Sequence, residues 1–333
     1  MAFHSPILAK TDAAPASLTA RSLPFLNNPL NAMKTPLILV AVDFSIGSRS
    51  ALEHAARLAV KQQARLHVLH VIDSLALSML AEHRGESFES ATRLAFESGR
   101  KSLDIWLARS PLPAGFEITL CIGNPLHEIL EHAKKFEASL LVAGIAGAGG
   151  NASGAGSTSL KIARKSPVNV LLVRQSHPQP FTKVVACLDL SDITPKVVQA
   201  ARDIAQQEGA SVDWLHVWND PGFMMPLIGP FGESGIGMAT DEMPLHADLA
   251  ARIASQLHEA VAEASAGLVS REVLKESTRA GHGIEEHVTD TSADLLVLGA
   301  HGHSALHYVL LGSTPERLLA RLTCSMLVVK DAS

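Results

Sequence analysis

The sequence predicts an α/β protein that contains two tandem, doubly wound, five-stranded parallel sheets. Two observations carry this prediction. Short apolar runs of strand length alternate with longer amphipathic stretches, which is typical of βαβ units. The same series of runs then occurs a second time within the 333 residues, and such self-similarity indicates a repeated structural unit. Right-handed crossovers between parallel strands then place helices on both faces of each sheet.

The internal repeat is visible directly in the sequence. The run LILVAVDFS (37–45) matches KVVACLDLS (183–191) with an offset of 146 residues (189 − 43). Further along, ASLLVAGIAG (138–147) matches ADLLVLGAHG (293–302), and there the offset is 155 residues (299 − 144). The second copy has therefore gained nine net residues, which we place between Asn219 and Leu245, a stretch dense in Gly, Pro and Met.

The elements of each copy follow in order from this pattern. The strands are apolar throughout because helices cover both faces of a parallel sheet, and the helices carry apolar residues at every third or fourth position. In the first copy we expect strands near 37–42, 65–71, 117–121, 139–143 and 168–173, and helices near 48–62, 87–109, 125–135 and 157–165. In the second copy we expect strands near 183–188, 211–217, 270–274, 294–298 and 325–329, and helices near 195–208, 246–266, 283–290 and 313–321.

The chain divides into two domains with a tail and a linker. Residues 1–34 are rich in Ala, Ser, Pro and Asn without sustained periodicity, so we expect a flexible N-terminal extension. The alternative is that the protein begins at Met33. The first domain is expected over 35–174, a short linker over 175–180, and the second domain over 181–333.

Composition excludes several classes of protein. The formal net charge of −5 gives no basic field for nucleic acid, and three scattered cysteines do not form a disulfide framework. The apolar runs are far shorter than the roughly 18 residues that a membrane span needs. We therefore expect a cytoplasmic protein with neither nucleic acid nor membrane as partner.

A glycine-containing loop follows the fourth strand of the second copy. Gly299 and Gly302 are separated from Gly312, Ser313 and Thr314 by a nine-residue spacer, and a helix follows. Glycines let the backbone approach a bulky anion, and the N–H groups at a helix start favour phosphate. The alternative is a strand-to-helix loop whose glycines serve only its turns.

The combination of these motifs resembles the universal stress protein family over both copies. Besides the loop, the resemblance includes the aspartate that ends the first strand, the LHV run and the closing strand MLVVK. It implies a Rossmann-like sheet of strand order 3-2-1-4-5 and, as in nucleotide-binding members, a loop that holds ribose and phosphates, with the aspartate near adenosine. Carried over to this chain, the implied site is Asp189, Val217, Gly299, His301, Gly302, Gly312, Ser313 and Thr314.

The first copy departs from this pattern. Its loop spacer is AGGNASGA, one residue shorter and without bulky side chains, so its closure on a ligand is expected to be weaker. The aspartate and the loop glycines are retained. A second nucleotide site in this copy would use Asp43, Val71, Gly144, Gly147, Gly156, Ser157 and Thr158.

Other ligand motifs are absent or incomplete. No G-x4-G-K-[ST] string occurs, and Gly281-His282-Gly283 lacks the third glycine of a dinucleotide fingerprint because Glu286 stands there. Histidines are frequent near the loop, but no cysteine pair accompanies them as structural zinc requires. We therefore predict no metal site among His282, His287, His301, His303 and His307.

Two functional hypotheses remain. The first is a stress-response or regulatory protein that binds ATP, ADP or AMP, with or without Mg²⁺, and a regulatory protein partner, with at most slow ATP hydrolysis. The second is a non-catalytic adaptor with degenerate nucleotide sites, which binds a protein partner or an apolar ligand. No catalytic residues are predicted.

The resemblance also predicts how the copies meet. In a sheet of order 3-2-1-4-5 the fifth strand lies at an exposed edge, which folded proteins cover. Because the linker is short, the strand over 168–173 can pair antiparallel with the strand over 325–329 inside one chain. We therefore expect an intramolecular pseudo-dimer through the fifth strands.

Overall fold

The structure, a computed structural model, describes residues 35–145, 157–174, 179–219, 242–301, 311–321 and 324–331. The first half contains β1 (Leu37–Val42), α1 (Ile46–Gln62), β2 (Arg65–Asp73), α2 (Ser74–Arg84), α3 (Phe88–Leu107), β3 (Glu117–Gly123), α4 (Pro125–Lys135), β4 (Leu140–Gly144), α5 (Ser157–Lys165) and β5 (Asn169–Val173). The second half contains β6 (Lys183–Cys187), α6 (Thr194–Glu208), β7 (Ser211–Trp218), α7 (Glu242–Ser265), β8 (Ser270–Glu276), α8 (Ala280–Asp290), β9 (Leu295–Gly299), α9 (Ser313–Arg321) and β10 (Ser325–Val329).

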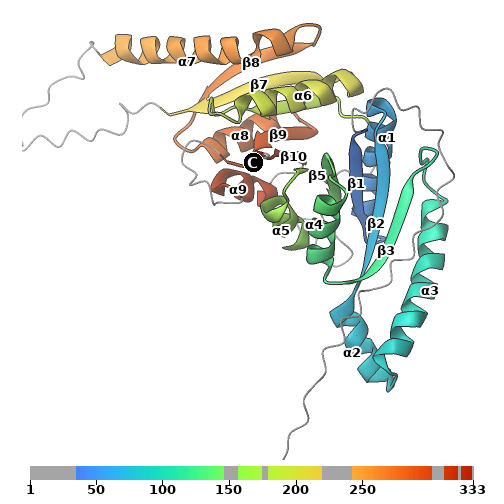
Figure 1. The fold of residues 1–333 in the computed structure, drawn as a ribbon. Helices are drawn as coiled ribbons and strands as arrows, with labels where there is room; N and C mark the ends of the chain where they lie inside the picture. The colour runs from blue at the N-terminus through green and yellow to red at the C-terminus, as the bar shows by residue number, and fades with distance from the viewer. Residues whose placement is uncertain are drawn as a thin grey trace, which may run out of the picture.

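All ten strands form one continuous sheet of order β3-β2-β1-β4-β5-β10-β9-β6-β7-β8 (Figure 1). Within each half the strands are parallel and follow the order 3-2-1-4-5, as predicted. The two halves join through β5 and β10, which pair antiparallel with Leu327 opposite Leu171. The predicted pairing of the fifth strands is therefore confirmed, and it fuses the two expected sheets into one.

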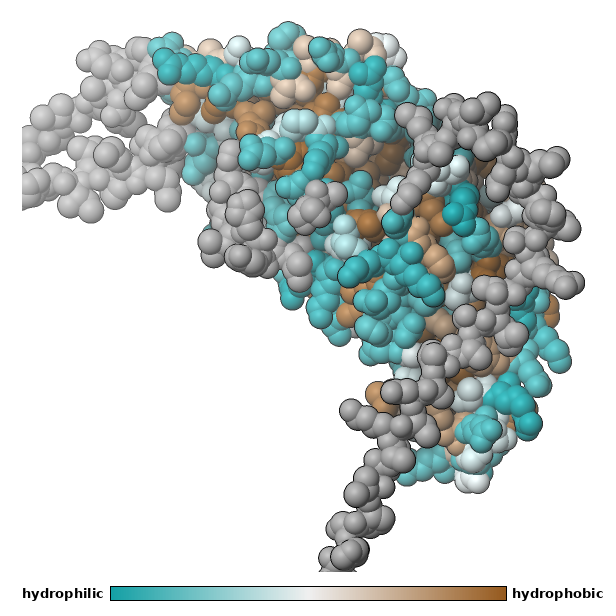
Figure 2. All heavy atoms as spheres, viewed as in Figure 1, coloured by the Kyte–Doolittle hydropathy of each residue, from teal (hydrophilic) through white to brown (hydrophobic). Residues whose placement is uncertain are grey.

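Helices cover both faces of the sheet and create two cores. One core contains side chains from α1, α3, α6 and α7, and the other contains side chains from α4, α5, α8 and α9. Each core runs through both halves. Burial of the apolar strands on both faces explains their unbroken hydrophobic sequences. In the view of Figure 2, hydrophilic residues cover most of the described surface and apolar ones appear in small areas.

Polar contacts hold the halves together beside the sheet. Glu208 at the end of α6 has a fully buried side chain that bonds Arg57 Nε of α1 at 3.1 Å and Lys61 Nζ at 3.3 Å. His54 of α1 stacks on Phe181, which precedes β6. The buried carboxylate is therefore paired with cations from the other half, as a buried charge requires.

The structure adds details that the sequence did not predict. Helix α2 was not expected; Asp73 caps it, and Leu77 and Ala81 bury its inner face against Ala91 of α3. In the second half, Asp213 pairs in register with Arg271, and at the corresponding position of the first half, His67 pairs with Glu117. The offset between the two copies is therefore 154 residues (271 − 117) at the third strand. One of the nine additional residues therefore lies after this strand pair, and not before Leu245 as predicted.

In the part of the chain that the structure describes, none of the helices is long and apolar enough to span a membrane.

Candidate functional site

The residues predicted from the second copy lie together at one edge of the sheet. Asp189 follows β6, Val217 lies near the end of β7, and Gly299 ends β9; these are neighbouring parallel strands. Ser313 and Thr314 begin α9. Ligands of doubly wound sheets bind at this carboxyl edge. The predicted residue Gly302 lies outside the described residues.

Asp189 organises the turn that leads into α6. Its Oδ1 accepts hydrogen bonds from the Ser191 backbone N–H at 3.1 Å, the Ser191 hydroxyl at 2.6 Å and the Thr194 hydroxyl at 3.4 Å. Leu190 between them adopts φ +61°, a conformation that non-glycine residues rarely take. The aspartate is therefore fixed at the carboxyl edge by its own turn.

Gly312, directly before α9, lies against the end of β9. The Gly312 N–H donates to the carbonyl oxygen of Ala300 at 2.7 Å. His301 is half-buried after the strand, Ser313 is exposed and Thr314 is half-buried. The start of α9 is therefore held next to the end of β9, with two hydroxyl side chains in its first turn.

Two glycines of α8 lie beside these residues. A Cβ atom on Gly283 would lie 2.8 Å from Val217 Cγ1, and one on Gly281 would lie 3.8 Å from Thr314 Cγ2. The predicted site did not include either glycine. Their signal was present in the incomplete fingerprint Gly281-His282-Gly283, since glycine in the first turn of a helix needs a packing or functional reason.

The helix N-termini at this edge differ between the halves. The N-caps of α6 and α8 are Ile193 and Arg279, and neither makes a side-chain capping bond. In the first half Ser45 caps α1 and Asn124 caps α4, each through its side-chain oxygen. A side-chain cap occupies an N–H group that could otherwise bind an anion.

The glycine that ends the fourth strand serves packing in both halves. A Cβ atom on Gly299 would lie 2.8 Å from Ile193 Cγ2, and one on Gly144 would lie 2.6 Å from the backbone carbon of Gly47. Because each glycine has no side chain, the start of the helix that follows the first strand can pack closely against the end of the fourth strand. Packing therefore gives both positions a reason to be glycine that is independent of a ligand.

The first-half residues lie at the equivalent edge, with differences. Asp43 accepts from the Ser45 N–H at 3.1 Å and the Ser45 hydroxyl at 2.5 Å, as Asp189 does from Ser191. Val71 is half-buried, and Thr158 is exposed on α5, which Ser157 begins. Gly147 and Gly156 lie outside the described residues.

Two first-half side chains that the sequence analysis missed occupy space at this edge. The buried Ser159 hydroxyl lies 2.8 Å from the carbonyl oxygens of both Gly144 and Ile145 and so ties α5 to β4. Glu128 of α4 corresponds in position to Gly283 of α8. The Oε1 atom of Glu128 would lie 2.6 Å from a Cβ atom on Gly123. The first half thus carries a carboxylate at the position where the second half has a glycine that packs against Val217.

The histidines near the loop have several partners. His287 Nε2 bonds Asp213 Oδ2 at 2.9 Å, and His282 Nε2 lies 3.2 Å from Glu286 Oε1. His303 and His307 lie outside the described residues. Burial acts to raise the pKa of Asp213, but hydrogen bonds from Arg271, His287 and Lys183 lower it overall. This ionic group lies near the amino ends of β6 to β8, away from the candidate site.

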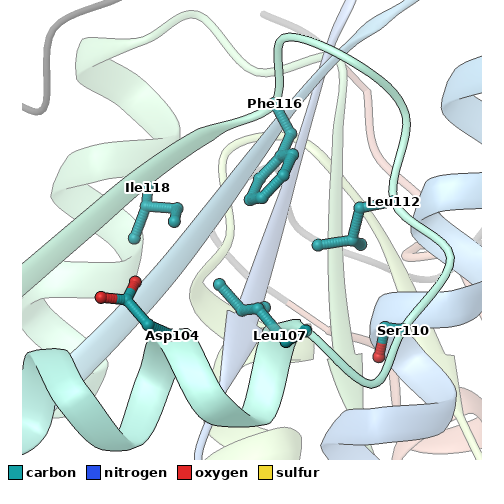
Figure 3. Close-up of a pocket in the computed structure, with 7 residues that line it drawn as sticks. Asp104, Leu107, Ser110, Leu112, Phe116 and Ile118 are labelled. Atoms are coloured by element: carbon teal, nitrogen blue, oxygen red, sulfur yellow. The ribbon is translucent and has the colours of Figure 1, made fainter.

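A separate cavity of about 370 Å³ lies in the first half beneath the loop that joins α3 to β3 (Figure 3). It is lined by Asp104, Leu107, Ala108, Ser110, Leu112, Phe116 and Ile118. Its apolar lining and its position away from the carboxyl edge distinguish it from the predicted nucleotide site.

Comparisons with known proteins agree with the arrangement of the chain. The model of the universal stress protein family matches residues 36–174 and 180–330. Universal stress protein YxiE of Bacillus subtilis is 32% identical over 151 residues, which cover 41% of this chain and 97% of that protein. The fold is similar to a functionally unknown protein from Pseudomonas aeruginosa, with a TM-score of 0.61 and 16% identity over 90% of this chain and 94% of that one. A universal stress protein from Archaeoglobus fulgidus gives a TM-score of 0.56 and 18% identity over 90% and 99%.

Proposed function

Because the chain belongs to the universal stress protein family, we propose that it is a cytoplasmic stress-response or regulatory protein that binds an adenine nucleotide in its second half. ATP, ADP or AMP would lie at the carboxyl edge of β6, β7 and β9. Binding would bias the conformation of the chain or its choice of a protein partner. Turnover of ATP would be slow at most, since no catalytic residues are assigned.

The observation that carries this proposal is the meeting of Val217 and the start of α9 with the ends of β6 and β9 at the carboxyl edge of the sheet. Gly283 packs closely against Val217, because a Cβ atom on this glycine would lie 2.8 Å from Val217 Cγ1. An apolar side chain next to glycines suits a flat adenine ring, and the Thr314 hydroxyl lies at the start of a helix, where phosphate binds. The residues present therefore fit the proposed ligand.

The charge at the carboxyl edge supports the second half over the first, because the second half has Gly283 at the position where the first half has Glu128. Glu128 adds a negative charge at the first-half edge, which opposes an anionic ligand.

Matched threonine variants test the proposal. We expect calorimetry to show ATP binding to the nucleotide-free protein, with micromolar to millimolar affinity, about −8 to −4 kcal/mol. Thr314→Val keeps the shape of the side chain but removes a hydroxyl that can bond phosphate, so affinity should fall about 10-fold, as expected for a hydrogen bond to a charged group. Titrations with ADP, AMP and GTP define the base and phosphate preference, and titrations with and without Mg²⁺ test the metal.

Thr158→Val is the control, because Thr158 is the corresponding residue of the first half. It should leave the ATP affinity within about twofold, since a surface substitution away from the site has little effect. Equal weakening by both variants would place the site elsewhere, and absence of adenine-nucleotide binding in the unmodified protein would refute the proposal.

A second candidate function, a non-catalytic adaptor for a protein partner or an apolar ligand, is favoured by the surface of α2 and α3. Apolar side chains are exposed there, including Leu75 at 69% and Met79 at 64%. The cavity of Figure 3 lies at the other end of α3. Apolar surface that remains exposed in a monomer is typical of interaction sites.

Cavity filling tests the apolar ligand. Leu112→Trp would fill the cavity and should abolish uptake of a medium-chain fatty acid measured by native mass spectrometry. Ile105→Trp adds the same side chain at an exposed position of α3 that is not part of the cavity lining, so uptake should persist. No fatty acid bound by the unmodified protein would reject this candidate ligand.

A further inference from the structure

Three potential metal ligands meet between β3 and α4 of the first half. Cys121 offers a sulfur, Glu128 a carboxylate oxygen and His132 a ring nitrogen, and these atoms all lie within 4.8 Å of one another. All three residues are half-buried. The cluster is separate from the histidines near the second-half loop.

The local fold brings the three side chains together. Glu128 and His132 are four residues apart on α4, so they project from the same side of the helix. Cys121 lies on β3, directly before this helix, and pairs in register with Val71 of β2. Gly123 between them has no side chain, and Glu128 Oε1 occupies the space that its Cβ atom would enter.

The hydrogen bonding of His132 also suits metal binding. Its Nδ1 lies 2.7 Å from the Glu128 carbonyl oxygen and 3.8 Å from Glu128 Oε2, so metal binding through Nε2 requires the Glu128 carboxylate to turn toward the other side of the ring. Because a carbonyl can only accept, Nδ1 carries the proton and Nε2 keeps its lone pair. Metal-bound histidines commonly have such a partner on the second nitrogen, which fixes the tautomer and the ring orientation.

We propose that Cys121, Glu128 and His132 form a Zn²⁺ site with an open coordination position. Thiolate, imidazole and carboxylate are together the ligand set of zinc, and three protein ligands leave the fourth tetrahedral position to water or another molecule. Ligand atoms around one tetrahedral Zn²⁺ lie about 3.5 Å apart. Contraction from the observed limit of 4.8 Å is within the reach of the flexible Glu128 side chain.

A divalent ion at this cluster would bind the thiolate form of Cys121 together with the carboxylate of Glu128, because metal ligation deprotonates a thiol.

The second half provides an internal comparison. Lys275 pairs with Val217 as Cys121 pairs with Val71, so lysine replaces the thiol. Gly283 replaces Glu128, and His287, which replaces His132, bonds Asp213 instead. At corresponding positions, the first half has three candidate metal ligands, and the second half has a lysine, a glycine and a histidine that bonds Asp213.

Cobalt substitution tests the site directly in the full-length chain. Reduced, metal-free protein is titrated with Co²⁺, whose bond to a thiolate gives a charge-transfer absorption in the near ultraviolet. We expect one equivalent with this absorption, which one equivalent of Zn²⁺ then displaces. Cys121→Ser should abolish the absorption. Glu128→Gln and His132→Gln should each weaken binding by at least about 100-fold, the upper effect of losing an outer-shell partner.

Three control variants make the result specific. Cys187→Ser removes another thiol, whereas Glu131→Gln and His127→Gln change exposed residues of the same helix. All three should bind Co²⁺ within about twofold of the unmodified protein. Histidines elsewhere can bind Co²⁺ but cannot produce the thiolate absorption. Retention of that absorption in Cys121→Ser, or its absence from the unmodified protein, would overturn the proposal.

Discussion

The two halves share a scaffold but differ at the carboxyl edge of their strands. In both, the residue after the first-strand aspartate has a positive φ, 65° at Phe44 and 61° at Leu190. In both, a histidine Nδ1 donates to a first-strand carbonyl, His70 to Val42 and His216 to Leu188. The helix caps and the residues facing Val71 and Val217 differ. The comparison teaches that the backbone can be retained while the chemistry at its edge changes.

A second difference lies at the opposite end of the sheet. Asp213, whose side chain is 2% exposed, bonds Arg271 at 2.8 Å, and His287 adds a further bond. At the corresponding position of the first half, His67 bonds the Thr119 hydroxyl at 2.8 Å and stacks on Phe136. The second half therefore has a buried carboxylate that binds a mostly exposed arginine, at a position where the first half has a histidine that bonds Thr119 and stacks on Phe136, with Glu117 Oε2 3.4 Å from its Nδ1.

The largest expected effect comes from separating the halves. Leu327→Pro removes a backbone donor in the middle of β10, which pairs with β5 on one side and β9 on the other. We expect a loss of about 3 kcal/mol or more in the free energy of unfolding, measured by urea denaturation. Hydrogen exchange should show the amides of 170–173 losing protection, while β2 and β3 keep theirs. Unchanged protection of 170–173 would show that the halves do not depend on this pairing.

The next largest effect is expected from substituting the polar residue that lies opposite the third strand in each half, Asp213 in the second half and His67 in the first. Asp213→Asn should destabilise the protein by about 1.5–3 kcal/mol, because Arg271 and Lys183 lose a charged acceptor but remain partly exposed to solvent. His67→Gln should cost about 1 kcal/mol, the value of a neutral hydrogen bond. Urea denaturation measures both. Equal costs would mean that the two groups have the same energetic role despite their different charges.

A smaller effect is expected from substituting the glycine that ends the fourth strand of each half, and its size should differ between the halves. Gly144→Ala would place a Cβ atom 2.6 Å from the Gly47 backbone, which must then move, so we expect a cost of about 1–3 kcal/mol. In Gly299→Ala the new Cβ atom meets the Ile193 side chain at 2.8 Å. A side chain can turn away, so the cost should stay below about 1.5 kcal/mol. Thermal unfolding in both variants gives the order, and the reverse order would contradict the packing.

The smallest effect concerns pH. Burial lowers the pKa of both His67 and His70, so the folded first half holds them neutral. Their contribution to stability is complete above the unfolded pKa of about 6.5 and is lost as pH falls below it, because the unfolded chain binds more protons. The pKa of Asp213 is also lowered, so its contribution is complete above about 4 and is lost only below that.

Hydrogen exchange at pH 7 and pH 5, corrected for the intrinsic exchange rates, should therefore show protection falling more in the first half than in the second. A double variant, His67→Gln with His70→Gln, should remove the difference. An equal fall in both halves of the unmodified protein would contradict the assignment.

The regular parts of the fold could be predicted because their signals are local. Apolar runs marked most of the strands, the repeat placed β8, and the predicted linker over 175–180 together with the sheet order implied by the family resemblance led to the β5–β10 pairing. Helix α2 was missed because its buried face has only Leu77 and Ala81. A face of that size gives a weak periodic signal.

The candidate site could be predicted only in part. The aspartates and loop residues follow a linear motif, whereas Gly283 acquires its meaning from Val217, a residue on another element. The same is true of Ser159, which bonds β4 from α5, and of Glu128, which lies over Gly123. Contacts between distant residues decide these roles, and the periodicity of a single sequence does not report them.

The covalent connection between β5 and β10 has a consequence for mutation. In a symmetric homodimer, every substitution occurs twice, once on each side of the interface, so both sites gain or lose a property together. Here the two sides of the antiparallel pair are encoded separately, and a substitution changes one side only. Glu128 and its counterpart Gly283 can therefore differ. A single gene thus encodes two carboxyl edges that selection can act on independently, at a fixed ratio of one to one.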